Sequence, residues 1–432
     1  MASPTPSAPP AVGWIARTLE EGGYDTWAVG GAVRDAYMGR PSGDWDLATR
    51  ATPREVQKLF RRTVPIGIDH GTVGVLARDG TMYEVTTFRK DVETDGRHAV
   101  VSFADTIEED LARRDFTVNA VAWHPLREVL LDPFGGVGDL ERRILRTVGA
   151  PEERFREDYL RILRALRFAG LFRLEVEAAT WTALCSLVGH LPALSAERVR
   201  EELLKVLDAD PAPGRALDLY ASSGALAVLY PELDALRGAS SEVVGVDRWT
   251  HSVAATAELP AGRPFLRLAA LLREAGGDAR AGLLLRLKLS NAQTDETALR
   301  AGAAPLPPSD AEDRDVRRWL SSSGSSRIAA LARLDLAWSR AACRLGGHDR
   351  TGAVVSSWRR AKQVRSTAPP LAVGDLALDG RGLISLGLPP GPDFGRILDA
   401  LLDWVLDDPS RNRRELLEGK ALELAGSDSA DG

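Results

Sequence analysis

The sharpest chemical feature of the sequence is a pair of aspartates, Asp44 and Asp46, separated by a single residue. In a β-strand alternate side chains point to the same face, so the two carboxylates would lie side by side. Paired carboxylates offer the hard oxygen ligands that suit Mg²⁺. Such a site can stabilise the attacking and leaving oxygens of a phosphoryl transfer. Most pairs of this kind are simply solvated, so their meaning depends on the surrounding residues.

A glycine-rich turn followed by an arginine precedes this pair. Residues 30–34 read GGAVR, and Arg34 stands ten residues before Asp44. Glycines where a strand passes into a helix let backbone N–H groups approach a phosphate, and the helix N-terminus favours anions. Gly31 is therefore a candidate phosphate contact, and Arg34 can pair with a triphosphate through two hydrogen bonds. The segment predicts a nucleotide-binding turn beside the carboxylates.

Two further segments carry residues that suit the same chemistry. Glu84 lies in the β-like run of residues 83–88 (YEVTTF), and it would complete the metal site if that strand neighbours the aspartates. Otherwise it is an exposed strand glutamate. Residues 113–120 (RRDFTVNA) place Arg114 where it can contact nucleotide phosphate or sugar, with Asp115 and Asn119 as ribose contacts or structural anchors. The alternative for this segment is a surface charge cluster.

The order of these motifs resembles that of the class II tRNA nucleotidyltransferases, which belong to the polymerase β-like nucleotidyltransferase superfamily. The sequence reads GGAVRD from residue 30, DWD from 44, HGTVG from 70, YEVTTFR from 83 and EEDLARRDFTVNA from 108. The resemblance implies that Asp44, Asp46 and Glu84 serve the metal ions, expected to be Mg²⁺. It also implies template-independent addition or repair of the 3′-terminal CCA of tRNA from CTP and ATP, with release of pyrophosphate.

Residues 155–168 (FREDYLRILRALRF) are similar to the segment of that family that contains E-D-x-x-R. On a helix, Asp158 and Arg161 would be neighbours and present an acceptor beside a donor. This order matches cytosine and adenine and mismatches guanine and uracil; a mismatch leaves buried polar groups unpaired. The alternative is an exposed ion pair. Arg164 and Arg167 extend the basic stripe, and the resemblance implies nucleotide contacts for both, although Arg167 falls about half a turn from Asp158.

The elements that would position these residues suggest an α+β protein. Short strands and helices alternate up to about residue 148: we expect an N-terminal nucleotidyltransferase α/β head, a small mixed sheet with helices, with a loop at 89–104 and a capping box at residues 52–55 (TPRE). Helical periodicity then takes over, with one long helix at 151–172 broken near Gly170. The expected organisation is a disordered tail (1–12), the head (13–148), an all-α neck with the nucleotide-selecting helix (149–215), a helical body (216–340) and a helical tail that binds tRNA (341–432).

The body resembles a decayed phosphohydrolase core of the HD type. Residues 249–252 (WTHS) and 267–276 (RLAALLREAG) carry this resemblance, but Arg273 and Glu274 replace the expected His-Asp pair. Loss of both ligands should abolish a metal-hydrolase site. We therefore expect no phosphatase activity and a structural role for His251.

Bulk composition sets the remaining limits. The 432 residues suggest more than one domain, and hydrophobic and charged fractions of 44% and 27% are typical of a globular protein. The net charge of −6 does not exclude a local basic groove. Cys185 and Cys343 have no expected disulfide partner and are expected to be buried thiols in a reducing cytoplasm. No apolar run is long enough to predict a membrane span.

Three alternatives remain open. A partial enzyme would add only CC or only A, and the length of the expected loop at 89–103, which includes residues 95–98 (DGRH), bears on this choice. A poly(A) polymerase would make long A tracts, but its expected G-[RK]-R-F-like stretch does not appear. A non-catalytic RNA-binding protein would show no metal-dependent nucleotide incorporation.

Overall fold

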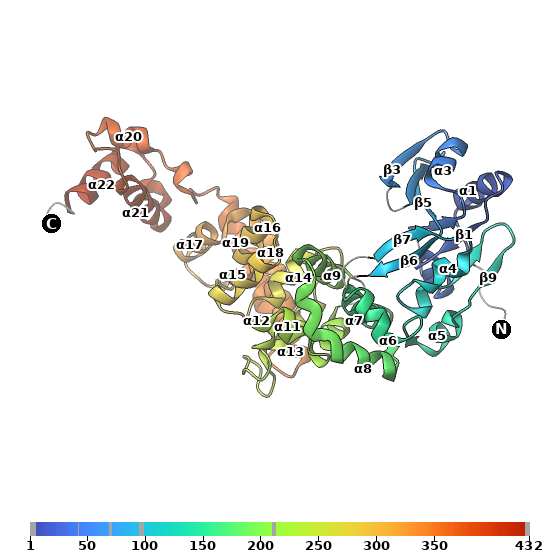
Figure 1. The fold of residues 1–432 in the computed structure, drawn as a ribbon. Coiled ribbons are helices and arrows are strands. Elements are labelled where there is room, and N and C mark those ends of the chain that lie inside the picture. The colour runs from blue at the N-terminus through green and yellow to red at the C-terminus, as the bar shows by residue number, and fades with distance from the viewer. Residues whose placement is uncertain (1–5, 42, 69–70, 95–98, 210–212, 428–432) are drawn as a thin grey trace. The chain divides into compact units, whose positions relative to one another are not determined.

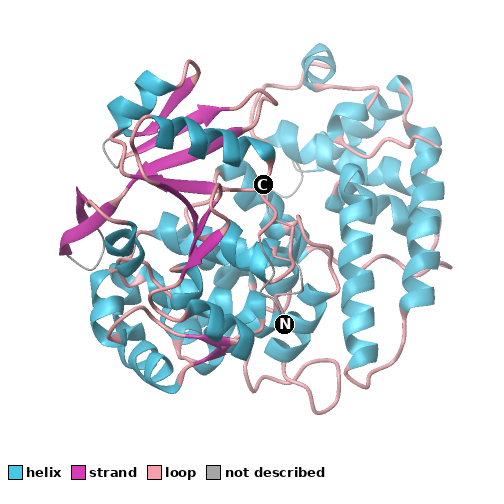
Figure 2. Cartoon of the chain, turned by 90° about the vertical axis from the view of Figure 1, so that its right-hand side faces the viewer, coloured by secondary structure: helices cyan, strands magenta, loops and turns pink. Residues whose placement is uncertain are grey.

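The computed structural model describes residues 6–41, 43–68, 71–94, 99–209 and 213–427. The chain divides into two compact units, residues 1–231 and 232–432. Figure 1 labels the elements along the chain, and all of the strands among the described residues belong to the first unit (Figure 2). The mixed sheet followed by helices confirms the α+β class.

The first unit is built around a seven-stranded sheet with the order β3-β4-β5-β2-β1-β8-β9. The β2–β5 pair is parallel and the other pairs are antiparallel, so the sheet is mixed. Its strands are β1 (Thr26–Val29), β2 (Asp46–Thr49), β3 (Thr63–Gly67), β4 (Thr72–Leu76), β5 (Met82–Thr87), β8 (Ala122–His124) and β9 (Val129–Leu131). The short strands β10 (Ile144–Leu145) and β11 (Glu175–Val176) pair separately.

Register explains how the sheet brings distant motifs together. Val29, the last residue of β1, pairs with Asp46, the first residue of β2. The turn at Gly30 therefore begins beside Asp46. Leu47 pairs with Val85 in the parallel β2–β5 pair, so the preceding residues, Asp46 and Glu84, lie across from each other. The sheet thus places three sequence motifs at one end of β2.

Alternating side chains give the sheet a core on each face. On β1 and β2, Ala28 and Leu47 join one hydrophobic cluster, whereas Trp27 and Ala48 join the other. The first cluster includes the apolar stripe of α1 (Pro10–Glu21), and the second includes Leu111 of α4 (Ile107–Ala112). This alternation is the expected consequence of the two-residue period of a strand.

Helices make up the rest of the first unit, mostly after residue 150 as expected. They are α2 (Gly31–Tyr37), α3 (Pro53–Leu59), α5 (Gly136–Arg142), α6 (Pro151–Glu157), α7 (Leu160–Phe172), α8 (Ala178–Leu187), α9 (Ala196–Asp208), α10 (Gly214–Ser222) and α11 (Ala225–Leu229), with 3₁₀ turns η2 (Thr117–Asn119) and η3 (Val188–Ala193), and α12 (Pro231–Asp234) follows at the junction. The expected capping box opens α3, with Thr52 and Glu55 in reciprocal contact. That expectation is confirmed.

Two expected elements differ from the structure. The segment expected to be a loop contains a hairpin of β6 (Arg89–Thr94) and β7 (Ala99–Phe103). Its two arms contain Val92, Thr94, Val100 and Val101, β-branched residues that favour strands. Residues 95–98 lie outside the described residues.

The long helix expected at 151–172 breaks at Asp158 and not near Gly170. Asp158 has φ −157° and ψ 107°, which separates α6 from α7. Gly170 instead lies within α7, where an added Cβ would come within 2.5 Å of the Ala216 Cβ on α10. The glycine permits close packing of two helices and does not end the helix.

The second unit is helical throughout its described part. It contains α13 (Arg248–Ala257), α14 (Pro264–Leu271), α15 (Gly277–Arg286), α16 (Asn291–Gly302), α17 (Asp313–Ser323), α18 (Ile328–Arg344), α19 (Thr351–Ser366), α20 (Gly380–Ser385), α21 (Asp393–Asp407) and α22 (Arg414–Ser427), with 3₁₀ turns η4 (Ser325–Arg327), η5 (Val373–Asp375) and η6 (Pro409–Arg411). Arg317 donates to the backbone carbonyls of Leu406 and Asp407 at the end of α21, each at 2.7 Å. A charged side chain thereby satisfies carbonyls that a helix end leaves open.

The HD-like positions are used in packing. His251 is fully buried against the Trp338 ring, with ring centroids 4.5 Å apart, and Arg273 binds Asp335 at 2.6 Å. These contacts agree with a structural role for His251. The absence of phosphatase activity stays a prediction.

Two helices cross the expected domain limits. Helix α1 begins at Pro10 and Val12 is fully buried, so the helical stripe starts within the expected tail. Helix α18 runs through residues 340 and 341, and the other expected domain limits stay predictions. Cys185 is half-buried and Cys343 is exposed, which corrects the expectation of buried thiols; both are free cysteines. Among the described residues, no helix combines the length and apolar content that a membrane span needs.

Candidate active site

A cavity of about 590 Å³ in the first unit collects most of the residues expected to do chemistry. Its walls come from the β1–α2 turn, β2, β5, α4, the start of α7 and α9. Eight of the ten expected site residues line it: Gly31, Arg34, Asp46, Glu84, Arg114, Asp158, Arg161 and Arg164. The structure therefore brings together residues that are up to about 130 positions apart in the sequence.

The carboxylates gather at the start of β2. Asp44 is exposed just before the strand, Asp46 is half-buried, and Glu84 lies opposite on β5. Burial, together with the neighbouring carboxylates of Asp44 and Glu84, raises the pKa of Asp46 to about 6, while Arg114 opposes this rise. Carboxylate oxygens suit a divalent cation, whose charge would offset both the burial of the Asp46 carboxylate and the repulsion from Asp44 and Glu84.

The turn at Gly30 requires glycine for two reasons. Its φ of 74° lies in the left-handed region, which side chains disfavour. An added Cβ would also lie only 2.8 Å from Nη1 of Arg114. The turn thus leaves room for Arg114 beside Gly31 and the carboxylates.

A buried acid that the sequence interpretation missed positions this arginine. Asp110 accepts hydrogen bonds from Arg114 at 3.2 Å and from Arg113 at 3.4 Å, and also from the backbone N–H of Arg89. Asp110 is almost fully buried on α4. Its spacing of three and four residues from the two arginines is the helical spacing that could have revealed it.

The guanidinium of Arg34 is already bound by protein groups, unlike an arginine that waits for a phosphate. Its guanidinium donates to Asp35 at 2.9 Å and to Asn119 at 2.6 Å, and it lies 4.1 Å from the Phe172 ring centroid. Only 6% of Arg34 is exposed. The nucleotide contact expected for Arg34 stays a prediction, and the structure adds a role in joining α2 to α7.

Asp115 acts as an anchor inside this network. It accepts hydrogen bonds from Arg164 at 2.7 Å, from Asn119 at 3.0 Å and from the backbone N–H of Phe116 at 2.9 Å. Coulombic attraction to Asp115 is the main cause that raises the pKa of Arg164, so Arg164 remains cationic where it faces the cavity. Of the two roles considered for Asp115 and Asn119, these contacts favour the structural one.

Asp158 and Arg161 both line the cavity, and the Arg161 backbone N–H donates to the Asp158 carbonyl at 3.0 Å, but the contacts of their side chains go to other residues. Asp158 accepts from Arg198 at 2.7 Å and from the backbone N–H of Leu160 at 3.0 Å. Arg161 binds Glu157 and donates to the backbone carbonyl of Arg113 at 3.2 Å, which ties the neck to the head. These contacts do not match the alternative of an exposed ion pair between the two side chains, since the helix breaks at Asp158.

Arg167 lies outside this cavity. Its guanidinium binds the buried Glu202 of α9 at 2.7 Å and lines a neighbouring hollow. Phe168 stands between the two regions, with guanidinium carbons of Arg34, Arg164 and Arg167 at 5.2, 5.1 and 4.2 Å from its ring centroid. Sequence periodicity gave no indication of Glu202, Arg198 or this shared aromatic ring, because their partners are distant in sequence.

The cavity is basic although the chain is acidic. Its lining contains seven arginines and five acidic side chains, whereas the whole chain has a net charge of −6. Local charge of this kind attracts anionic ligands whatever the net charge of the molecule. A local basic cavity therefore lies beside the carboxylates, as the net charge alone did not exclude.

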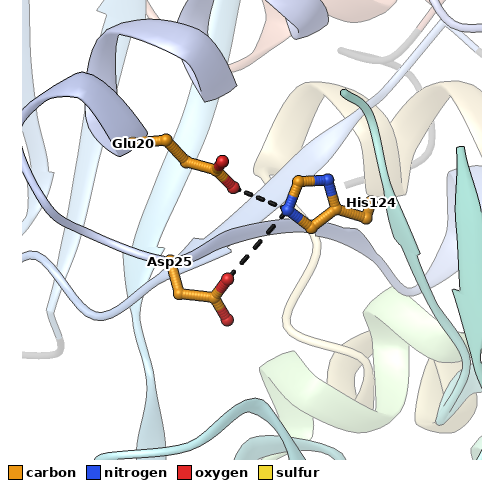
Figure 3. A group of neighbouring side chains, drawn as sticks. All are labelled: Glu20, Asp25 and His124. Atoms are coloured by element: carbon orange, nitrogen blue, oxygen red, sulfur yellow. Dashed lines mark ion pairs between the residues drawn. The ribbon is translucent and has the colours of Figure 1, made fainter. Parts of the chain in front are cut away.

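A second acidic group lies at the opposite end of β1, where Glu20, Asp25 and His124 converge (Figure 3). Nε2 of His124 lies 2.6 Å from Glu20 and 4.0 Å from Asp25. Its Nδ1 accepts backbone N–H groups of Leu126 and Arg127. Burial lowers the pKa of His124, so the neutral ring carries its one proton on Nε2. A metal ion would need that nitrogen bare, so the group fits a structural brace.

Family comparisons agree with the geometry. Residues 26–146 match the model of the poly A polymerase head domain, and residues 173–237 match that of the probable RNA and SrmB-binding site of polymerase A. The sheet, its acidic end and the basic cavity therefore define a nucleotidyltransferase. The name of the head-domain model does not say which nucleotides are added, and relatives that match nearly the whole chain bear on that question.

The chain is 35% identical to the CCA-adding enzyme of Geobacillus stearothermophilus over 95% of both chains. It is 32% identical to that of Lactobacillus delbrueckii subsp. bulgaricus over 92% of this chain and 93% of the relative. The crystal structure of the Bacillus stearothermophilus CCA-adding enzyme in complex with CTP matches with a TM-score of 0.75 and 32% identity, over 99% of this chain and 100% of that one. This chain belongs to the family of CCA-adding enzymes, which are tRNA nucleotidyltransferases.

Proposed function

We propose that Asp44, Asp46 and Glu84 hold Mg²⁺ where this tRNA nucleotidyltransferase adds the 3′-terminal CCA, without a nucleic-acid template, from CTP and ATP. The strand register that sets Asp46 opposite Glu84 and beside the Gly30 turn is the observation that carries the proposal. The raised pKa of Asp46, caused first by burial and then by Asp44 and Glu84, agrees with it. When bound there, divalent cations would neutralise phosphate charge and favour ionisation of the attacking hydroxyl. The full-length relatives, all named CCA-adding enzymes, support the reaction.

The tRNA 3′-hydroxyl attacks the α-phosphate of the nucleotide. A phosphorus–oxygen bond forms to the tRNA as the bond to pyrophosphate breaks, so the chain grows by one nucleotide. Arg114, positioned by Asp110, and the backbone at Gly31 lie beside the carboxylates and would bind the triphosphate. Arg164, kept cationic by Asp115, would bind the nucleotide from the α7 side.

Base choice is assigned to Asp158 and Arg161. An aspartate acceptor beside an arginine donor matches the amino group and bare ring nitrogen of cytosine and of adenine. Their shared cavity supports this role even though the two side chains do not pair with each other. The base would therefore bridge them. We also propose that the reaction takes place in the cytoplasm.

The proposal is tested by Mg²⁺-dependent incorporation of each NTP into tRNA transcripts. Asp44→Ala should lower incorporation by at least about a thousandfold, because it removes a metal ligand from the transition state. Asp158→Ala should retain metal dependence but lose its preference for CTP over UTP. Arg156→Ala, an exposed change on α6, is the matched control and should behave as wild type. Normal base choice in Asp158→Ala would refute the selector role.

A further inference from the structure

Asp158 lies at a break between two helices, so regular helical geometry does not fix its side chain. Its φ of −157° and ψ of 107° break the chain between α6 and α7, and its side chain is half-buried. Within its own segment, the carboxylate of Asp158 accepts a hydrogen bond from the backbone N–H of Leu160 at 3.0 Å. A carboxylate that must read a base needs a further restraint, since rotation about its side-chain bonds would move the acceptor.

Arg198 of α9 supplies that restraint. Its Nη2 donates to Oδ2 of Asp158 at 2.7 Å, across forty residues of sequence. The backbone of Arg198 is itself fixed, because its N–H donates to the capping hydroxyl of Ser195 at 3.4 Å. One turn further along α9, the buried Glu202 binds Arg167 of α7 at 2.7 Å. This second ion pair joins α9 to α7 outside the cavity that Arg198 lines.

We propose that Arg198 is a positioning residue that sets base specificity by orienting the carboxylate of Asp158. This inference rests on the proposed selecting role of Asp158. A carboxylate accepts about four hydrogen bonds, so pairing with Arg198 does not prevent it from accepting the amino group of a base. Arg198 also lines the cavity, which places its guanidinium at the edge of the space for the base.

Loss of this restraint should allow UTP to be used in place of CTP. Uracil presents a ring N–H where cytosine has a bare nitrogen, and a carboxylate that turns can accept from that N–H. The oriented carboxylate beside Arg161 cannot do so without leaving donors unpaired. Removing Arg198 should therefore favour UTP relative to CTP, while the carboxylates that serve the metal remain unchanged.

The experiment compares kcat/KM for CTP and UTP on a tRNA transcript lacking its tail, together with thermal stability. Arg198→Ala should lower the CTP preference by about tenfold or more, as expected for loss of one charge-assisted hydrogen bond. Arg198→Lys should restore part of the preference. Adding Arg198→Ala to Asp158→Ala should cause no further loss, because both changes remove the same interaction.

Glu202→Gln is the matched control, since it weakens the neighbouring ion pair on the same helix. It should lower thermal stability and keep the CTP preference. Wild-type preference in folded Arg198→Ala, or an equal loss of preference in Glu202→Gln, would overturn the positioning role. If Arg198→Ala does not fold, Arg198→Lys with unaltered preference would overturn it as well. A wild-type enzyme that fails to incorporate CTP would instead contradict the proposed function.

Discussion

Asp46 is a half-buried carboxylate whose ionisation lowers the stability of the fold. Its pKa of about 6 lies above that of an unfolded aspartate, so the folded protein holds the proton more tightly. The stability this proton provides is complete below about pH 4 and is lost as the pH rises to about 6. At neutral pH without a cation, the ionised carboxylate therefore destabilises the fold.

Asp46→Asn should consequently stabilise the protein in EDTA at pH 7.5, by roughly 2 kcal/mol after allowance for solvent screening. The gain should shrink toward pH 4.5, where wild-type Asp46 is itself protonated. Mg²⁺ should raise the melting temperature of the wild type more than that of the variant. Thermal unfolding of both proteins at the two pH values measures this. A variant no more stable than wild type at pH 7.5 in EDTA would contradict the raised pKa of Asp46.

Phe168 of α7 is a shared aromatic contact for arginines in the cavity and beside it. Three guanidinium groups surround the ring of Phe168, which also packs edge-on against Phe116 at 5.9 Å. Each cation–π contact contributes about 0.5–1 kcal/mol, and more when desolvated. The ring thus fixes arginines that belong to α2 and α7 in one arrangement.

Phe168→Leu should lower the free energy of unfolding by about 2 kcal/mol and lower kcat/KM for CTP by about tenfold. The stability loss follows from the missing ring contacts, and the activity loss from movement of Arg34 and Arg164. Trp14→Leu serves as control, because Trp14 contacts Phe60 outside the cavity. Denaturant unfolding and steady-state kinetics check both effects. Unchanged kinetics in a destabilised Phe168→Leu would show that the ring only supports the fold.

Local patterns predicted much of the fold and of the candidate site. Motif order pointed to Asp44, Asp46, Glu84 and Arg114, because each lies in a short segment whose residue types suit one chemistry. The prediction that Asp158 and Arg161 are neighbours on one continuous helix was wrong, because the chain breaks at Asp158. The hairpin at β6 and β7 was missed because charged residues and turn formers concealed its strand pattern.

Long-range partners could not be derived from periodicity at all. Arg198 lies forty residues from Asp158, and Glu202 lies thirty-five residues from Arg167. Nothing in the local sequence of α9 distinguishes these side chains from ordinary exposed charges of an amphipathic helix. Only the packing of α9 against α7 reveals their partners, and of the two only Arg198 lines the cavity.

The whole chain is acidic, but the cavity beside its carboxylates is basic. Seven arginines against five acids line the cavity of a chain with net charge −6. Binding of the tRNA 3′ end should therefore depend on salt. Because phosphate contacts release counterions, affinity should fall by roughly tenfold or more between about 50 and about 200 mM salt. Fluorescence anisotropy with labelled tRNA measures this, and affinity that stays constant or rises with salt would contradict a basic binding site.

The most direct test of the account measures incorporation of each labelled NTP, with Mg²⁺, on three tRNA transcripts: one ending before the tail, one after C and one after CC. We predict CTP incorporation on the first two and ATP incorporation only on the third. CTP alone or ATP alone would identify a partial enzyme, and long A tracts on any RNA would identify a poly(A) polymerase. No incorporation on any transcript would contradict the central claim that this cavity builds the CCA end of tRNA.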